Sequence, residues 1–380
     1  MKQNKNILKN PGVQSLLTSL LCILLGLFLG YLVLLLINPA GAWGAITNVM
    51  KNFMTYSSGK AQLKYLGNTL VRTAPLLMCS LSVLFVYKVG LFNIGAAGQY
   101  VAGACACLYA GLYLHWHWLP CMLLAIAAGA LLGTVSGLLK SFFNVSEVIS
   151  GIMLNWIALY TTNMLLTNVK EPTSPYTYQL KAEGPQAILP GISLSKLLSN
   201  NQYVTIAIPI AIVCAIVIWV VLSKTLFGYE LKATGNNPNA AKYCGMAEKR
   251  NIILTLAIGG ALAGLGASLL YQTGYEQWQC TYSSVPSMGF NGIAAAFLGG
   301  LSPIGSIFAS FFIQHITAGG AYVDKSLYCS QISDLISAII IYLCSFVLFF
   351  KTVLNSWIAR HEEKKAHKAA QVAGKGGEQA

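Results

Sequence analysis

The chain has 380 residues, of which 9% are charged and 56% are hydrophobic, and its formal net charge is +13. A soluble domain carries about 25% charged residues, so this composition excludes an ordinary soluble protein and predicts an all-α polytopic membrane protein. The lysines gather in loops and tails between apolar runs. Membrane topology therefore explains the positive charge better than nucleic-acid binding does.

Several apolar runs approach or exceed the roughly 20 residues that span a bilayer. The first run is too long for a signal peptide, whose apolar region has about 7–15 residues, and predicts a retained helix. We expect about ten transmembrane helices, some of them short or broken. In chain order, the predicted spans are residues 15–37, 69–87, 94–114, 118–139, 147–166, 204–222, 252–273, 290–301, 303–319 and 332–350.

The distribution of lysine and arginine predicts the orientation of these spans. With the N-terminus in the cytoplasm, most of the 24 Lys and Arg residues fall on the inner side. An even number of spans then places the C-terminus inside as well. Residues 1–359 are expected to form a single transmembrane domain, with 38–68 and 168–203 outside the cell. The Lys-, Ala- and Gly-rich residues 360–380 are expected to be a basic, disordered cytoplasmic tail.

A polar, glycine-rich stretch, GLFNIGAAGQY, precedes and interrupts the third run at residues 90–100. Asn93 and Gln99 each offer hydrogen-bond donors and acceptors, while Gly95 and Gly98 permit a helix break and close backbone approach. Inside a membrane such a stretch is tolerated only against other protein or a water-filled cavity. Two interpretations stay open: a discontinuous helix lining a pathway for a polar, uncharged solute, or a hydrogen-bonded contact between helices.

The fifth run places another amide within the membrane. Ser146 and Glu147 are typical of a helix start, where a carboxylate interacts favourably with the helix dipole. Asn155 lies eight residues later, about 12 Å along a helix, near the middle of the bilayer. Its side chain is expected either to line a cavity or to bond to a neighbouring helix.

Two similar stretches suggest an internal repeat: FNIGAA at residues 92–97 and FNGIAA at residues 290–295. In the predicted topology they begin spans from opposite sides, as inverted repeats do around a central substrate site. Chance similarity is the alternative, because Gly, Ala and Ile are common in such chains. After the second stretch, Gly299, Gly300 and Pro303 predict a break or tight reversal.

The sequence shows no catalytic or cofactor-binding constellation. His115 and His117 are two residues apart and do not share a helix face, so no metal site is expected. The sequence contains no GxxxxGK[ST] phosphate loop and no row of intramembrane carboxylates for a proton relay. A disulfide between Cys280 and Cys329 stays open. Active transport would need an energy source outside this chain; a secondary transporter or facilitator and a lipid-modifying membrane enzyme are the competing interpretations.

Four ordered stretches resemble the membrane subunit of bacterial ABC importers for simple sugars and nucleosides, and specifically its nucleoside branch. GLFNIGAAGQ (90–99) resembles the family's GLFNIGAEGQ, with Ala97 in place of Glu. EVISGIMLN (147–155) resembles its EVI…IMLN segment, and GYELKATGNNPNAAKYCGM (228–246) resembles its cytoplasmic segment. GFNGIAAAFLGGLSPIG (289–305) resembles GFDGIAVALLGG…PIG, with Asn291 in place of Asp.

The resemblance implies a roughly ten-helix permease that imports nucleosides across the bacterial cytoplasmic membrane; a simple sugar such as ribose is the alternative. It implies cytoplasmic ATP-binding subunits, a second permease chain that is related but different, and an extracytoplasmic nucleoside-binding protein, but no cofactor. For such a permease, we expect Asn93, Gln99, Asn155 and Asn291 to line the translocation pathway. Residues 228–246 would transmit the motion of the ATPase, through Gly235, Asn236, Asn237, Pro238, Ala241 and Gly245.

Overall fold

The structure is a computed structural model of the chain that describes residues 11–324, residues 326–328 and scattered positions between 335 and 356. The predicted span 332–350 therefore lies largely outside the described residues. The predicted tail 360–380 and Cys329 lie wholly outside them.

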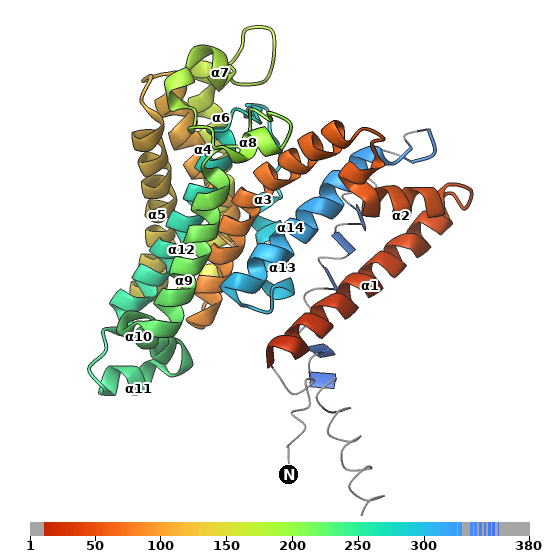
Figure 1. Cartoon of the computed structure of the whole chain (residues 1–380). Coiled ribbons are helices and arrows are strands. Elements are labelled where there is room, and N and C mark those ends of the chain that lie inside the picture. Colours follow the sequence, from red (N-terminus) through yellow and green to blue (C-terminus); the bar gives the residue numbers. More distant parts are fainter. Residues whose placement is uncertain are drawn as a thin grey trace, which may run out of the picture.

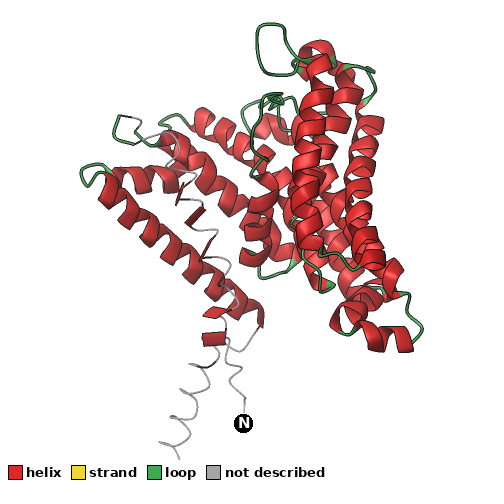
Figure 2. Cartoon of the chain, turned by 180° about the vertical axis from the view of Figure 1, so that it is seen from behind, coloured by secondary structure: helices red, strands yellow, loops and turns green. Residues whose placement is uncertain are grey.

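The described part of the chain is built of helices joined by loops, with only isolated β-bridges and no strand (Figure 2). The α-helices are α1 (Pro11–Ile37), α2 (Ala42–Lys51), α3 (Gly59–Lys88), α4 (Ala96–Leu112), α5 (Trp118–Phe143), α6 (Glu147–Leu166), α7 (Leu180–Glu183), α8 (Leu194–Leu197), α9 (Ala207–Lys224), α10 (Leu226–Asn236), α11 (Pro238–Tyr243), α12 (Glu248–Tyr271), α13 (Met288–Leu298) and α14 (Pro303–Gly319).

Seven of the described helices are long and apolar enough to cross a membrane: α1, α3, α5, α6, α9, α12 and α14, the last extended by its 3₁₀ turn. Helix α4 has 17 residues and α13 has 11, so short helices occur in the third and eighth predicted spans. These findings confirm the prediction of an all-α polytopic membrane protein with short and broken helices.

The second span differs from its prediction because α3 begins at Gly59, ten residues before the apolar run. The polar segment GKAQLKYLGN continues the helix outward, and its Lys, Gln, Ala and Leu residues are good helix formers. With 30 residues, α3 is about 45 Å long, longer than the roughly 30 Å hydrocarbon core. Residues 38–68, expected to be an external loop, therefore hold α2 and the first turns of α3.

Helix α3 is the central element of the bundle. In its apolar stretch 89% of the residues are buried, against 28% in α5 and α9 and 22% in α1. The helices around it expose apolar side chains such as Leu131, Ile157 and Val213, as expected for surfaces that meet lipid or another chain.

A seam of small residues holds α5 against α12, which lie side by side in Figure 1. Cβ atoms added at Gly129 and Gly133 would overlap carbonyl oxygens of Gly260 and Leu256 on α12. Small residues at four-residue spacing let two membrane helices pack backbone to backbone. Helix α12 thus packs against α5 on one side and against α3 and α4 on the other.

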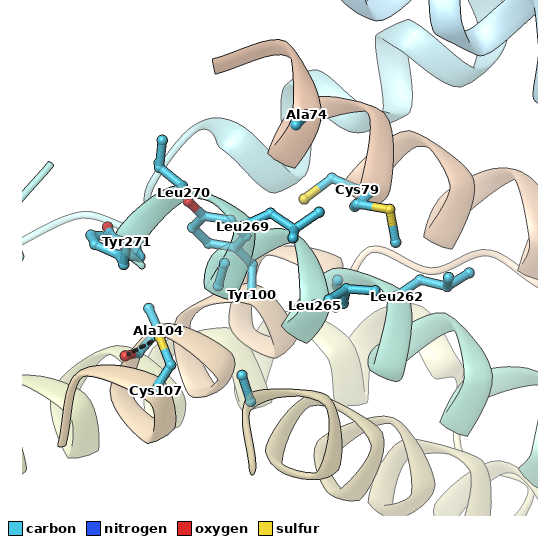
Figure 3. Close-up of a cluster of buried hydrophobic side chains, with 14 of the residues drawn as sticks. Ala74, Cys79, Tyr100, Ala104, Cys107, Leu262, Leu265, Leu269, Leu270 and Tyr271 are labelled. Carbon is cyan, nitrogen blue, oxygen red and sulfur yellow. Dashed lines mark hydrogen bonds between the residues drawn. The ribbon is translucent and has the colours of Figure 1, made fainter. Parts of the chain in front are cut away.

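The core beside α3 is filled by side chains from three helices (Figure 3). Cys79 comes from α3, Tyr100 from α4, and Leu269 and Tyr271 from α12. The rings of Tyr100 and Tyr271 lie 6.3 Å apart, and both are buried.

The two ends of the bundle carry different elements. Figure 1 shows α7 and α8 at one end and α10 and α11 at the opposite end, with the start of α1 toward the latter. Helices α1, α2, α13 and α14 lie on one side of α3, and α5, α6 and α12 lie on the other.

Candidate functional site

Asn93 and Gln99 bond to each other at the interruption between α3 and α4. The Asn93 Nδ2 donates to the Gln99 Oε1 at 2.8 Å, and the Gln99 Nε2 donates to the Asn93 Oδ1 at 3.2 Å. Asn93 Nδ2 also donates to the hydroxyl of Ser82 on α3, at 2.9 Å. Both amides are 2% exposed. The pair therefore ties the loop 89–95 to helices on both sides of it.

Asn155 on α6 caps the start of α4 from outside. Its Oδ1 accepts from the backbone N–H of Gly98 at 2.7 Å, and its Nδ2 donates to the carbonyl of Ile94 at 3.1 Å. Gly98 is the third residue of α4, so its N–H is one of the amides that the helix itself leaves unbonded. One buried side chain thus satisfies both the helix start and the loop before it.

Gly98 is required for this arrangement. A Cβ atom there would lie 2.6 Å from both the Cα and the Oδ1 of Asn155, closer than packed atoms approach. Gly95 immediately precedes α4, and its backbone meets that of Gly151, one turn before Asn155. These contacts bring α6 directly against the interrupted segment.

Asn291 lies apart from the other three predicted pathway residues. It sits half-buried in α13, and within the described residues its side chain has no hydrogen-bond partner. The start of α13 nevertheless meets the start of α4, because a Cβ on Gly289 would overlap the backbone of Ala97. The two stretches proposed as a repeat are therefore adjacent, although FNIGAA leads into α4 whereas FNGIAA lies inside α13.

The chain reverses between α13 and α14. Gly299 follows the last residue of α13, Gly300 has a φ of +64°, and Pro303 is the first residue of α14. The Ser302 hydroxyl accepts from the backbone N–H of Gly305 at 3.5 Å and caps α14. The interruption thus falls where glycine and proline suit its geometry.

Segment 228–246 forms most of α10, the short helix α11 and the turn after it. Asn236 is the last residue of α10. Asn237 caps α11, its Oδ1 accepting from the Ala240 N–H at 3.1 Å, and Pro238 is the first helical residue. Ala241 is buried, and Gly245 turns the chain with a φ of +79°.

Gly235 connects this segment to the interrupted helix. A Cβ on Gly235 would overlap the carbonyl oxygen of Val89, and Gly90, at a φ of +79°, lies against the backbone of Gly235. Asn93 follows three residues later. Nearby, Asn251 of α12 donates to the Thr234 hydroxyl at 2.9 Å. The α10–α11 segment therefore touches the turn that leads into the Asn93 network.

A cleft of about 410 Å³ opens beside this contact, between the ends of α3, α5 and α10 and the starts of α6, α11 and α12. Lys140 and Glu147, both on its wall, form an ion pair at 2.9 Å. Glu248 and Lys249 also line it. Among the described residues, no group of three His, Cys, Asp or Glu could hold a metal ion.

A second polar cluster, at the α7–α8 end, was not predicted. Arg72 of α3 forms an ion pair with Glu276, and its guanidinium lies 5.3 Å from the ring centre of Tyr275. Burial raises the pKa of the Tyr275 phenol, and the nearby Arg72 opposes this shift. The only hint in the sequence is that Arg72 lies near the outer end of an apolar run. An arginine in that position can also simply extend its side chain to the membrane surface.

A bundle of apolar helices, with one helix interrupted at a buried amide network and a helical hairpin packed beneath it, defines a multi-pass membrane protein of the transport class. The chain belongs to the family described as the permease component of branched-chain amino acid transport systems, whose pattern matches residues 65–345. This match confirms the resemblance to ABC-importer permeases, and it makes the chain a transport component.

Similar curated proteins cover nearly the whole chain. It is 30% identical to the nucleoside ABC transporter permease protein NupB of Lactococcus lactis, over 98% of this chain and 100% of that protein. It is 32% identical to the guanosine ABC transporter permease protein NupP of Bacillus subtilis, over 86% and 92%. The glucose ABC transporter permease protein TsgB13 of Haloferax volcanii is 27% identical, over 88% of each chain. No solved structure matches significantly.

Proposed function

We propose that this chain is the permease subunit of an ATP-driven importer that moves nucleosides across the bacterial cytoplasmic membrane. The observation that carries the proposal is the similarity to NupB along the full length of both chains. The sequence has no phosphate loop, so ATP would be hydrolysed by partner subunits.

The α10–α11 end faces the cytoplasm in this proposal. Lysine and arginine are enriched in cytoplasmic loops, and this end carries Lys224, Lys232, Lys242, Lys249 and Arg250. The start of α1 lies toward the same end (Figure 1), consistent with a cytoplasmic N-terminus. A tenth span at 332–350 would return the C-terminus to the cytoplasm.

Cytoplasmic ATP-binding subunits would dock on α10 and α11. Tyr243 at the end of α11 is 93% exposed, and Tyr229 and Leu226 of α10 are also exposed. Large apolar side chains in water are typical of a protein interface. A displacement of α11 would reach the membrane through the backbone contact of Gly235 with Val89 and Gly90, and then through Asn93.

The solute would pass beside Asn93, Gln99, Asn155 and Asn291. In the arrangement seen here Asn93 bonds to Gln99 and to Ser82, and Asn155 bonds to the backbone of Gly98 and Ile94. Displacement of the loop 89–95 would exchange these bonds for bonds to solute hydroxyls and ring nitrogens. Weak, neutral contacts of this kind allow a nucleoside to enter and to leave.

Two further partners complete the proposed complex. A second permease chain, related but different, would pair with this one, and an extracytoplasmic binding protein would deliver nucleosides to the α7–α8 end. Both partners rest on the resemblance of the four motifs to nucleoside importers.

A simple sugar is the second candidate substrate, because the chain is also similar to a glucose permease over 88% of its length. Uptake of labelled guanosine and labelled ribose by cells with and without this gene separates the two. The proposal predicts loss of guanosine uptake alone, restored by a plasmid copy of the gene. Loss of ribose uptake alone would move the substrate to sugars. Guanosine uptake that persists without the ATP-binding subunits would favour a secondary transporter.

A further inference from the structure

Arg72 of α3 and Glu276, in the loop after α12, form a partly exposed ion pair. Helix α3 is the most buried of the long helices, yet the Arg72 side chain is 36% exposed and that of Glu276 is 29% exposed. Arg72 lies 16 residues, about 24 Å, from the α10 end of α3. The pair therefore lies toward the α7–α8 end of the central helix, and part of each side chain is exposed.

Tyrosines from five separate segments gather near this ion pair. Tyr65 lies on the same face of α3 as Arg72, two turns nearer the start of the helix. Its ring stacks on that of Tyr56 at 4.3 Å, and the ring of Tyr275 meets that of Tyr203 edge-on at 5.2 Å. We call these residues, with Tyr322, the tyrosine cluster: Tyr56, Tyr65, Tyr203, Tyr275 and Tyr322. All five are partly exposed.

The loop that carries Tyr275 and Glu276 is held independently of the ion pair. On one side, Gln272 Nε2 donates to the carbonyls of Trp118 and Ala187, at 2.9 and 3.1 Å. On the other, Trp278 Nε1 donates to the Asn163 Oδ1 at 2.9 Å, and Trp278 is fully buried. The loop needs no further tether, and a partly exposed ion pair adds little to stability.

The ion pair retains unused hydrogen-bonding capacity. Glu276 occupies one guanidinium nitrogen of Arg72, while the buried Nε has no partner among the described residues. A guanidinium carries five N–H donors, and a carboxylate accepts several bonds. Charged side chains within membrane segments mark substrate pathways by default.

We propose that Arg72, Tyr275 and Glu276 form a nucleoside-binding site at the outer mouth of the permease. The site rests on the proposed function, which supplies the class of substrate. Arg72 donates to the ring nitrogens and carbonyls of the base. Tyr275 and the neighbouring tyrosines contact its aromatic face, as aromatic side chains do with nucleic-acid bases. Glu276 accepts from the 2′ hydroxyl of the ribose.

The ribose contact can be tested by comparing two substrates. If Glu276 only held the loop in place, its replacement would affect the uptake of both substrates equally. The complete importer is purified through this chain and reconstituted in liposomes, and uptake of guanosine and 2′-deoxyguanosine is measured with saturated binding protein. The wild-type importer takes up guanosine about tenfold faster than 2′-deoxyguanosine. The deoxynucleoside lacks the hydrogen bond to the Glu276 carboxylate, and losing a bond to a charged group costs about this factor. Glu276→Gln lowers guanosine uptake about tenfold and leaves 2′-deoxyguanosine within twofold. Subunit assembly of this variant is checked by size-exclusion chromatography and stays unchanged.

The aromatic contact is tested in the same liposomes. Tyr275→Leu lowers uptake of both substrates about tenfold, whereas Tyr275→Phe retains it, because stacking needs the ring and not the hydroxyl. Tyr113, an exposed tyrosine that directly follows α4 at the same end, supplies the matched control: Tyr113→Leu has no effect.

Three results would overturn the site: an equal fall of both substrates in Glu276→Gln, no change in that variant, or a Tyr275→Phe variant as impaired as Tyr275→Leu. Failure of the proposed function looks different. In that case the wild-type complex imports neither nucleoside.

Discussion

Asn155 does two structural tasks with one side chain, and its surroundings make both of them necessary. It is 2% exposed, and it pairs with the N–H of Gly98 and the carbonyl of Ile94. A buried polar group left without a partner costs about 1–3 kcal/mol. At the residue scale, the interruption between α3 and α4 is therefore held open by amides that replace the missing helical hydrogen bonds.

Replacing Asn155 with Ala leaves both backbone groups unpaired. We expect the free energy of unfolding to fall by about 2–4 kcal/mol. Thermal unfolding of the detergent-solubilised chain measures the change, with Asn291→Ala as the control, because the Asn291 side chain has no hydrogen-bond partner among the described residues. Equal stability of the two variants would show that Asn155 does not support α4.

The seam between α5 and α12 sets the frame at the scale of elements. Gly133 has no room for a side chain, because any Cβ would overlap the Leu256 carbonyl. Ala127, on the exposed face of the same helix, has no such restriction. A bulky residue at Gly133 must push the two helices apart, whereas one at Ala127 meets lipid.

Gly133→Leu should therefore destabilise the chain by about 1–3 kcal/mol or more, the usual cost of overpacking. Ala127→Leu, the matched small-to-large change, should be close to neutral. The yield of monodisperse protein in detergent and its thermal unfolding midpoint report the difference. A Gly133→Leu variant as stable as Ala127→Leu would contradict the close packing of α5 and α12.

Gly235 tests the proposed route from the α10–α11 segment to α4. An added methyl would overlap the Val89 carbonyl and shift α10 away from the turn at Gly90. We expect Gly235→Ala to assemble with its partners but to transport about tenfold more slowly, equivalent to about 1.4 kcal/mol in the coupled step. In Gly44→Ala the added Cβ meets nothing within 4 Å, so this control should transport normally. Normal transport by Gly235→Ala would remove this contact from the route.

At the scale of the whole molecule, sequence pattern predicted the helical membrane fold because apolar run length is a local property. The reversal at residues 299–303 and the interruption before α4 fall where Gly, Pro, Asn and Gln cluster. The partners within the amide network were not predictable, since Asn155 and Gly98 are 57 residues apart. The pairing of Arg72 with Glu276 spans 204 residues and leaves no local trace. The early start of α3 was not predicted because residues 59–68 are polar, although many of them favour a helix.

The central claim is that this chain is the membrane pathway of an ATP-driven nucleoside importer. Its most direct test is the uptake of labelled guanosine into liposomes that contain the complex purified through this chain, with binding protein outside. The account predicts uptake that requires ATP at the α10–α11 face and stops when ATP hydrolysis is blocked. Guanosine uptake at the same rate without ATP, or ATP-driven uptake of ribose with none of guanosine, would contradict it.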